Sequence, residues 1–140
     1  EMKAICDEVI IMTDDGSAGR KGVSTVPVKE LCESQTPPAE VIAIGPPIMM
    51  KFCAQTTKEY GINTTVSLNT IMIDGTGMCG GCRVSVGGQT KFVCVDGPEF
   101  NAHEVDWDNM MMRMKSFKSR EQADDHKCRM LAQADALAKK

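Results

Sequence analysis

A glycine-rich loop with closely spaced cysteines constrains this chain more than any other feature. Residues 74–94 read D-G-T-G-M-C-G-G-C-R-V-S-V-G-G-Q-T-K-F-V-C and contain Asp74, Cys79, Cys82 and Cys94. Glycine has no Cβ, so the four glycines between positions 75 and 81 let the backbone curl around a bound centre and expose its N–H groups. The pattern therefore indicates a metal centre held by this loop.

The gaps between these residues match one kind of centre. Plant-type [2Fe–2S] loops place their cysteines as C-x4-C-x2-C with a distant fourth cysteine. The same gaps occur here with Asp74 in the place of the first ligand and with Cys94 as the distant one. We therefore predict a [2Fe–2S] cluster ligated by Asp74, Cys79, Cys82 and Cys94.

Two other interpretations fit the same residues. Cys79, Cys82 and Cys94 could hold zinc with Asp74 or His103 as the fourth ligand, which would make the segment a binding module without redox activity. The cysteines could also be small buried apolar residues. The run of glycines favours the cluster, because bridging sulfides accept hydrogen bonds from several backbone N–H groups whereas a zinc knuckle needs one tight turn.

Composition excludes several classes of protein. The seven cysteines are an odd number, and Cys6, Cys32, Cys53 and Cys128 stand alone, so we expect reduced thiols and no disulfide framework. The net charge of −3 provides no basic stripe for nucleic acid. There is neither an apolar run that could span a bilayer nor a signal-peptide pattern, so we expect a cytoplasmic chain without membrane contact.

The first half predicts an α/β arrangement. Apolar strand-like runs alternate with helical segments, and strand, helix, strand, helix, strand is half of a doubly wound parallel sheet. The expected strands are 8–13, 40–44 and 64–68, and the expected helices are 26–32, with Ser24 or Thr25 as the N-cap, and 48–59, closed by Gly61.

The second half predicts a hairpin and a helical tail. Residues 83–86 and 91–95 alternate as two strands around Gly87-Gly88, which places Cys94 on a strand beside the cluster loop. A helix is expected to begin at Trp107, and residues 121–139 have helical content. Because so short a chain has little surface to cover this tail, we expect it to be exposed or to pack on another subunit, a second copy of the chain included.

Two loops that follow the expected strands predict a ligand site, because open α/β sheets bind ligands at the carboxyl ends of their strands. The first loop contains Asp14, Asp15, Gly16 and Ser17, and its carboxylates could accept hydrogen bonds from a ribose diol. The second contains Gly45 and Pro46 at a helix start, where the backbone could lie against a flat ring or a phosphate.

Together, these segments resemble one family. The stretches T-D-D-G-S-A-G-R-K-G, V-I-A-I-G-P-P-I-M-M, M-I-D-G-T-G-M-C-G-G-C-R-V and F-V-C-V-D-G-P-E-F are similar to electron-transfer subunits of the ferredoxin–NADP reductase superfamily. The likeness is greatest to the small subunit of NADH-dependent reduced ferredoxin:NADP oxidoreductase, also called sulfide dehydrogenase, with the dihydroorotate dehydrogenase electron-transfer subunit as a near relative. It runs from about Asp7 to Met114.

The resemblance implies the carboxyl-terminal half of a ferredoxin-reductase-type nicotinamide-binding sheet over 1–70, a small [2Fe–2S] domain over 71–106 and a helical tail over 107–140. The FAD-binding barrel of the family and the first strand of the nicotinamide domain have no counterpart here, so we expect a carboxyl-terminal fragment that is inactive alone and contains no catalytic residue. In the full subunit the family relays electrons between NAD(H) or NADP(H), FAD and a large flavoprotein or iron–sulfur partner. Thr76, Gly77 and Gly80 would shape the cluster loop.

Two departures from the family pattern refine this expectation. Ile44 stands where many members have a cysteine before the Gly-Pro pair, and Asp74 stands where the dihydroorotate type carries cysteine. The second departure favours the ferredoxin:NADP type. Asp14 and Asp15 would accept a ribose 2′-hydroxyl and oppose a 2′-phosphate, so the resemblance predicts NADH over NADPH.

Overall fold

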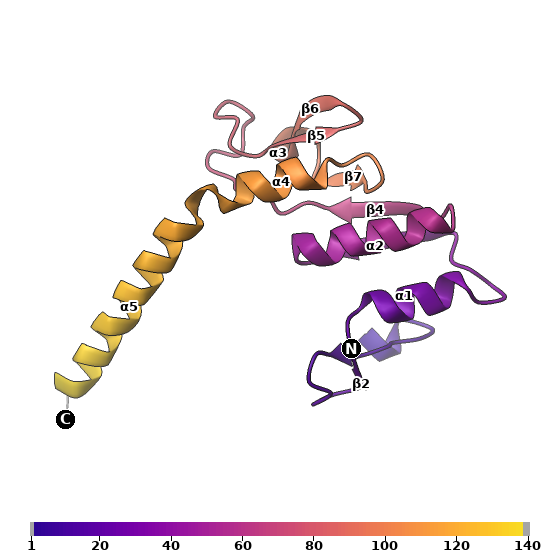
Figure 1. The fold of residues 1–140 in the computed structure, drawn as a ribbon, viewed down its shortest axis with the longest axis horizontal. Helices are drawn as coiled ribbons and strands as arrows, with labels where there is room; N and C mark the ends of the chain where they lie inside the picture. The colour runs from indigo at the N-terminus through magenta and orange to yellow at the C-terminus, as the bar shows by residue number, and fades with distance from the viewer. Residues whose placement is uncertain (1, 139–140) are drawn as a thin grey trace.

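The chain folds as a mixed α/β protein whose elements follow each other from a small N-terminal unit to a long C-terminal helix (Figure 1). The computed structural model describes residues 2–138, and the side chains of residues 2–130. A 3-10 turn, Met2–Ala4, precedes the two-residue strands β1, Met12–Thr13, and β2, Arg20–Lys21, which pair in parallel. Helix α1, Thr25–Cys32, follows; Ser24 precedes it without a side-chain capping hydrogen bond.

The central sheet has three strands in the order β3-β4-β7. Strands β3, Glu40–Ile44, and β4, Asn63–Ser67, are parallel and are connected by helix α2, Pro47–Glu59. Pro47 suits the first turn of α2, where its missing N–H has no intrahelical partner to lose. Gly61 ends the helix region with φ +66, and its N–H donates to Lys58 O at 3.1 Å.

The cysteine-rich segment forms a hairpin that packs on this sheet. Strands β5, Arg83–Val86, and β6, Gln89–Phe92, are antiparallel, and the turn between them has positive φ at both glycines, Gly87 and Gly88. One helical turn, α3, Val93–Asp96, leads to β7, Glu99–Asn101, which pairs antiparallel with β4. The sheet is therefore completed by a strand that follows the cluster loop in the chain.

Three C-terminal helical segments complete the structure. They are α4, Trp107–Met114, the 3-10 turn Lys115–Phe117, and α5, Lys118–Ala138. The side chain of Asp106 caps α4 by accepting the Asn109 N–H at 3.0 Å. Figure 1 shows α5 leading away from the rest of the molecule, and its residues 118–130 are exposed, as the sequence predicted for the tail.

One apolar core joins the sheet, the hairpin and α4. Met50 from α2, Val66 from β4, Val93 from α3 and Met110 from α4 are each at most 1% exposed and belong to one cluster of buried side chains. The Trp107 ring lies in the same core, and its Nε1–H donates to Ala102 O at 3.1 Å. The cluster loop is therefore anchored on a packed base.

The structure corrects two of the predicted strands. The expected strand 8–13 shrinks to Met12–Thr13 and does not join the β3-β4-β7 sheet. It pairs in parallel with β2 in a separate two-stranded sheet, where only Met12 and Thr13 have strand partners, Arg20 and Lys21. The expected strand 91–95 ends at Phe92, because residues 93–96 form α3 and the Phe92 N–H donates to the Asp96 carboxylate at 2.6 Å.

None of the described helices is both long and apolar enough to cross a membrane. Among the four scattered cysteines, Cys32 and Cys53 are buried and Cys6 and Cys128 are exposed. Burial raises the pKa of the Cys53 thiol.

Candidate iron–sulfur and nucleotide sites

The cluster loop is built from glycines that take conformations closed to other residues. Gly75, Gly77 and Gly80 have φ values of +77, +82 and +65. A Cβ on Gly77 would lie 3.2 Å from the Val95 side chain, and one on Gly81 would lie 3.4 Å from Cys79 Sγ. The loop therefore needs glycine at 77 for its backbone conformation, whereas at 81 a methyl group would meet Cys79 Sγ only at ordinary contact distance.

Two of the predicted ligands lie together on the base of the loop. Cys82 immediately precedes β5, and Cys94 lies on α3 rather than on a strand, because β6 ends two residues before it. Their Sγ atoms are 3.2 Å apart, and Cys82 is 2% exposed. The hairpin predicted from the sequence thus brings these two thiols together at its open end, where Arg83 of β5 pairs with Phe92 of β6.

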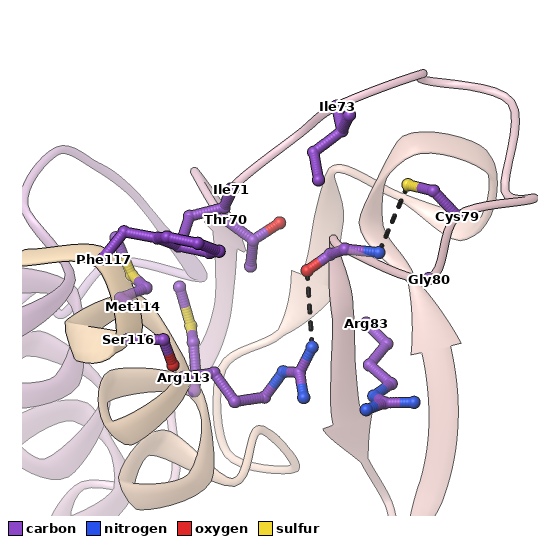
Figure 2. A pocket seen from close by; sticks show the side chains of 12 residues that line it. Thr70, Ile71, Ile73, Cys79, Gly80, Arg83, Arg113, Met114, Ser116 and Phe117 are labelled. Carbon is purple, nitrogen blue, oxygen red and sulfur yellow. Dashed lines mark hydrogen bonds between the residues drawn. The ribbon is translucent and has the colours of Figure 1, made fainter. Parts of the chain in front are cut away.

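The pKa of Cys94 is raised, first by its hydrogen bond with Cys82 and then by desolvation. The backbone N–H of Gly77 acts in the opposite direction and lowers the pKa of Cys94, because a nearby donor favours the thiolate. Cys79 receives a similar bond from the Gly81 N–H at 3.3 Å (Figure 2). Two of the three sulfurs are therefore already within reach of backbone N–H donors.

Asp74 organises the opposite end of the loop. One carboxylate oxygen accepts the Thr76 N–H at 2.8 Å and the other accepts the Cys79 N–H at 2.9 Å. The pKa of Asp74 is lowered, chiefly by the Thr76 hydrogen bond. Within the part of the chain that the structure describes, no three His, Cys, Asp or Glu side chains form a ready-made metal site. The ligand set of Asp74 and the three cysteines stays a prediction.

A second hollow contains two of the residues predicted to bind nucleotide. Asp14 and Pro46 both line a cavity of about 540 Å³ between the loop after β1 and the start of α2. Most of the other lining residues are apolar. The sequence analysis missed these apolar residues because they come from two separate segments, α2 and the loop between β2 and α1. They are Val23, Ile48, Met49 and Phe52, with Ser24 and Thr25 beside them.

The remaining residues of the predicted nucleotide site do not line this cavity. Asp15 accepts the Ser17 N–H at 2.9 Å, which lowers the pKa of Asp15 and closes a turn in which Gly16 has φ +79. Gly45, with φ +155, precedes Pro46. The structure thus brings Asp14 and Pro46 to one cavity and places the other four next to them in sequence.

A residue that the sequence analysis missed lies beneath the cluster loop. Arg113 of α4 donates from Nη2 to the Gly81 carbonyl oxygen at 3.5 Å (Figure 2). Its only signal in the sequence is its position as the single cation within M-M-M-R-M.

The family comparison agrees with this geometry. Residues 69–106, which contain the glycine loop, the hairpin and all four predicted ligands, match the iron–sulfur cluster binding domain of dihydroorotate dehydrogenase B. The segment that holds the glycine loop and the hairpin is therefore similar to an iron–sulfur cluster binding domain.

Similar proteins narrow this class. The chain is 52% identical over 122 residues to the dihydroorotate dehydrogenase B (NAD(+)) electron transfer subunit homolog of Thermotoga maritima, covering 86% of this chain and 42% of that protein. It is 36% identical over 107 residues to the electron transfer subunit of dihydroorotate dehydrogenase B from Clostridium perfringens, covering 76% of this chain and 42% of the relative.

A solved structure of NADH-dependent reduced ferredoxin–NADP oxidoreductase, studied for flavin-based electron bifurcation, matches with a TM-score of 0.73 and 46% identity. The match covers 86% of this chain and 43% of that one. The chain is thus a homologue of the electron-transfer subunits of these oxidoreductases, as the sequence motifs predicted. It spans about two fifths of the length of the curated relatives it matches.

Proposed function

We propose that this chain carries the [2Fe–2S] cluster of an oxidoreductase electron-transfer subunit, with Asp74, Cys79, Cys82 and Cys94 as its ligands. One observation carries the proposal most directly: Cys82 Sγ and Cys94 Sγ lie 3.2 Å apart at the base of a glycine loop whose N–H groups face sulfur. Three thiols and one carboxylate suit iron, and N–H donors suit sulfide and thiolate acceptors. When bound, such a cluster supplies one-electron transfer.

The residues of the chain have separate tasks in this proposal. Gly77 and Gly81 direct N–H groups toward Cys94 and Cys79, which stabilises thiolate over thiol. Asp74 closes the start of the loop, because its carboxylate accepts hydrogen bonds from the Thr76 and Cys79 N–H groups. The buried position of Cys82 keeps water away from one side of the centre.

Metal analysis after anaerobic purification or reconstitution tests the proposal. We expect about two irons and two sulfides per chain, with the visible absorbance of a [2Fe–2S] protein. Cys94→Ser should lose most of this iron. Cys53→Ser, which changes a buried thiol outside the loop, should keep it. Stoichiometric zinc in a colourless protein, purified without added metal, would instead support the zinc module.

We infer further that the cavity beside Asp14 and Pro46 is the nicotinamide side of the same subunit. Its apolar lining suits a flat ring, and the Asp14 carboxylate suits a ribose hydroxyl better than a 2′-phosphate. In the longer protein that includes the flavin-binding part, electrons would pass between NADH, FAD and a larger flavoprotein partner through the cluster.

Flavin reduction by NADH and by NADPH in that longer protein tests this second step. NADH should be preferred, and Asp14→Asn should reduce the preference for NADH over NADPH. Asp15→Asn should reduce this preference less, because the Asp15 carboxylate is occupied in its own turn by the Ser17 N–H. The present chain alone should reduce flavin with neither nucleotide. A clear preference for NADPH would reject the assignment.

A further inference from the structure

Arg113 places a cation directly beneath the cluster loop. It lies near the end of α4, and its side chain crosses to the turn between Cys79 and Cys82, where Nη2 donates to Gly81 O at 3.5 Å. Gly81 is thereby held from both sides, because its own N–H donates to Cys79 Sγ (Figure 2). Gly81 is thus hydrogen-bonded both to the Arg113 guanidinium and to Cys79, a predicted ligand.

One further donor of the Arg113 side chain has no partner among the described residues. Arg113 Nε is buried and has no hydrogen-bond partner among the described residues. It borders a cavity of about 280 Å³ that Cys79, Gly80 and Gly81 line on the loop side and Met114 lines on the helix side. Every N–H of an arginine is a donor, so Arg113, which lines this cavity, carries one buried donor without an acceptor among the described residues.

The cavity contains positive charge without a matching carboxylate. Arg83 is its second cationic lining residue, no aspartate or glutamate lines it, and none of the ion pairs among the described residues includes Arg113. A partly buried cation without a counter-ion is unfavourable, so a fold that keeps one there is stabilised when an anion lies near. The anions that this loop can present are its thiolates and the centre they hold.

We propose that Arg113 is a positioning residue for the cluster, which fixes the Cys79–Cys82 turn through Gly81 and favours the reduced form of the centre by its charge. The inference rests on the function proposed above. A [2Fe–2S] centre with three thiolate ligands and one carboxylate ligand is a dianion when both irons are ferric and becomes a trianion when it gains one electron. A nearby cation stabilises the trianion more than the dianion, so Arg113 raises the reduction potential.

Redox titration of the reconstituted chain, followed by EPR of the reduced centre, tests the role of Arg113. Arg113→Gln should lower the equilibrium constant for one-electron reduction about tenfold, which corresponds to about 59 mV. Arg113→Lys keeps the charge and should stay within about threefold of the wild type. Lys115→Gln removes the same charge from an exposed position nearby and should change the equilibrium less than Arg113→Gln, because solvent screens it.

Each outcome separates this inference from the proposed function. Wild-type protein without iron and sulfide would reject the proposed function itself. Wild-type protein with a cluster whose potential is the same in Arg113→Gln, or shifts equally in Arg113→Lys or Lys115→Gln, would reject only the role of Arg113. If Arg113→Gln retains no cluster, Arg113→Lys decides: a loaded centre near the wild-type potential supports the charge, and loss of the centre in both variants overturns it.

Discussion

Replacing Gly77 by alanine is expected to destabilise the cluster loop by a calculable amount. Gly77 has φ +82, and the left-handed region costs a residue with a Cβ about 1–2 kcal/mol. The new Cβ would also lie 3.2 Å from Val95 Cγ2, but Val95 is 56% exposed and can turn aside, so the backbone conformation decides the cost. For a chain of this length, the melting temperature should fall by about 3–6 °C.

The assay combines thermal unfolding of the metal-free chain with iron retention by the loaded one. Gly77→Ala should lower both the melting temperature and the iron retained, because a changed backbone at 77 also moves the N–H that favours the Cys94 thiolate. Gly88→Ala is the matched control: Gly88 has φ +74, and no atom lies within 4 Å of the position that a methyl group would take there, so this variant should lose similar stability but keep its iron. An unchanged melting temperature in Gly77→Ala, or equal iron loss in Gly88→Ala, would refute the reasoning.

Three further outcomes are expected. The Tyr60 hydroxyl donates to the Glu33 carboxylate at 2.6 Å, which raises the pKa of Tyr60 to about 12. Glu33→Gln should therefore move the pKa of this single tyrosine, followed by ultraviolet titration, toward its ordinary value of about 10. An unmoved midpoint would contradict this. Asp74→Cys should keep the cluster but alter its EPR signal and potential, and an unchanged spectrum would show that Asp74 is not a ligand. Mild oxidation of the metal-free chain should link Cys82 to Cys94 before any other pair, and peptide mapping that finds another disulfide first would contradict the observed proximity.

Local signals in the sequence were sufficient where the structure is local. Helix α2 begins at Pro47 and is followed by Gly61, and the β5–β6 hairpin turns at Gly87 and Gly88, because these residues favour such conformations whatever surrounds them. Local signals were not sufficient to predict the extent and pairing of the first strand, expected over residues 8–13 and observed at Met12–Thr13. Its apolar run predicts burial, but pairing depends on a neighbouring strand that no local pattern identifies.

The same distinction applies to the candidate site. The motif spacing predicted Cys82 and Cys94 as ligands of one centre, and their Sγ atoms lie 3.2 Å apart, while the ligand set itself stays a prediction. The position of Arg113 beneath the loop was not predictable, because it depends on how α4 packs against β5. A cation within a methionine run is equally compatible with a solvent-facing side chain.

The hairpin fixes Cys82 and Cys94 when the chain folds, so these two thiols would lose little conformational entropy on binding a metal. The β5–β6 pairing and the hydrogen bond from Val93 N–H to Cys82 O, at 3.2 Å, immobilise these two thiols when the chain folds. Cys79 lies on the glycine loop, where the chain has the most conformational freedom to lose. Two of the proposed ligands would therefore be held by the hairpin before metal binds, and the position of the third, Cys79, would depend on the loop that Asp74 closes through the Thr76 and Cys79 amides.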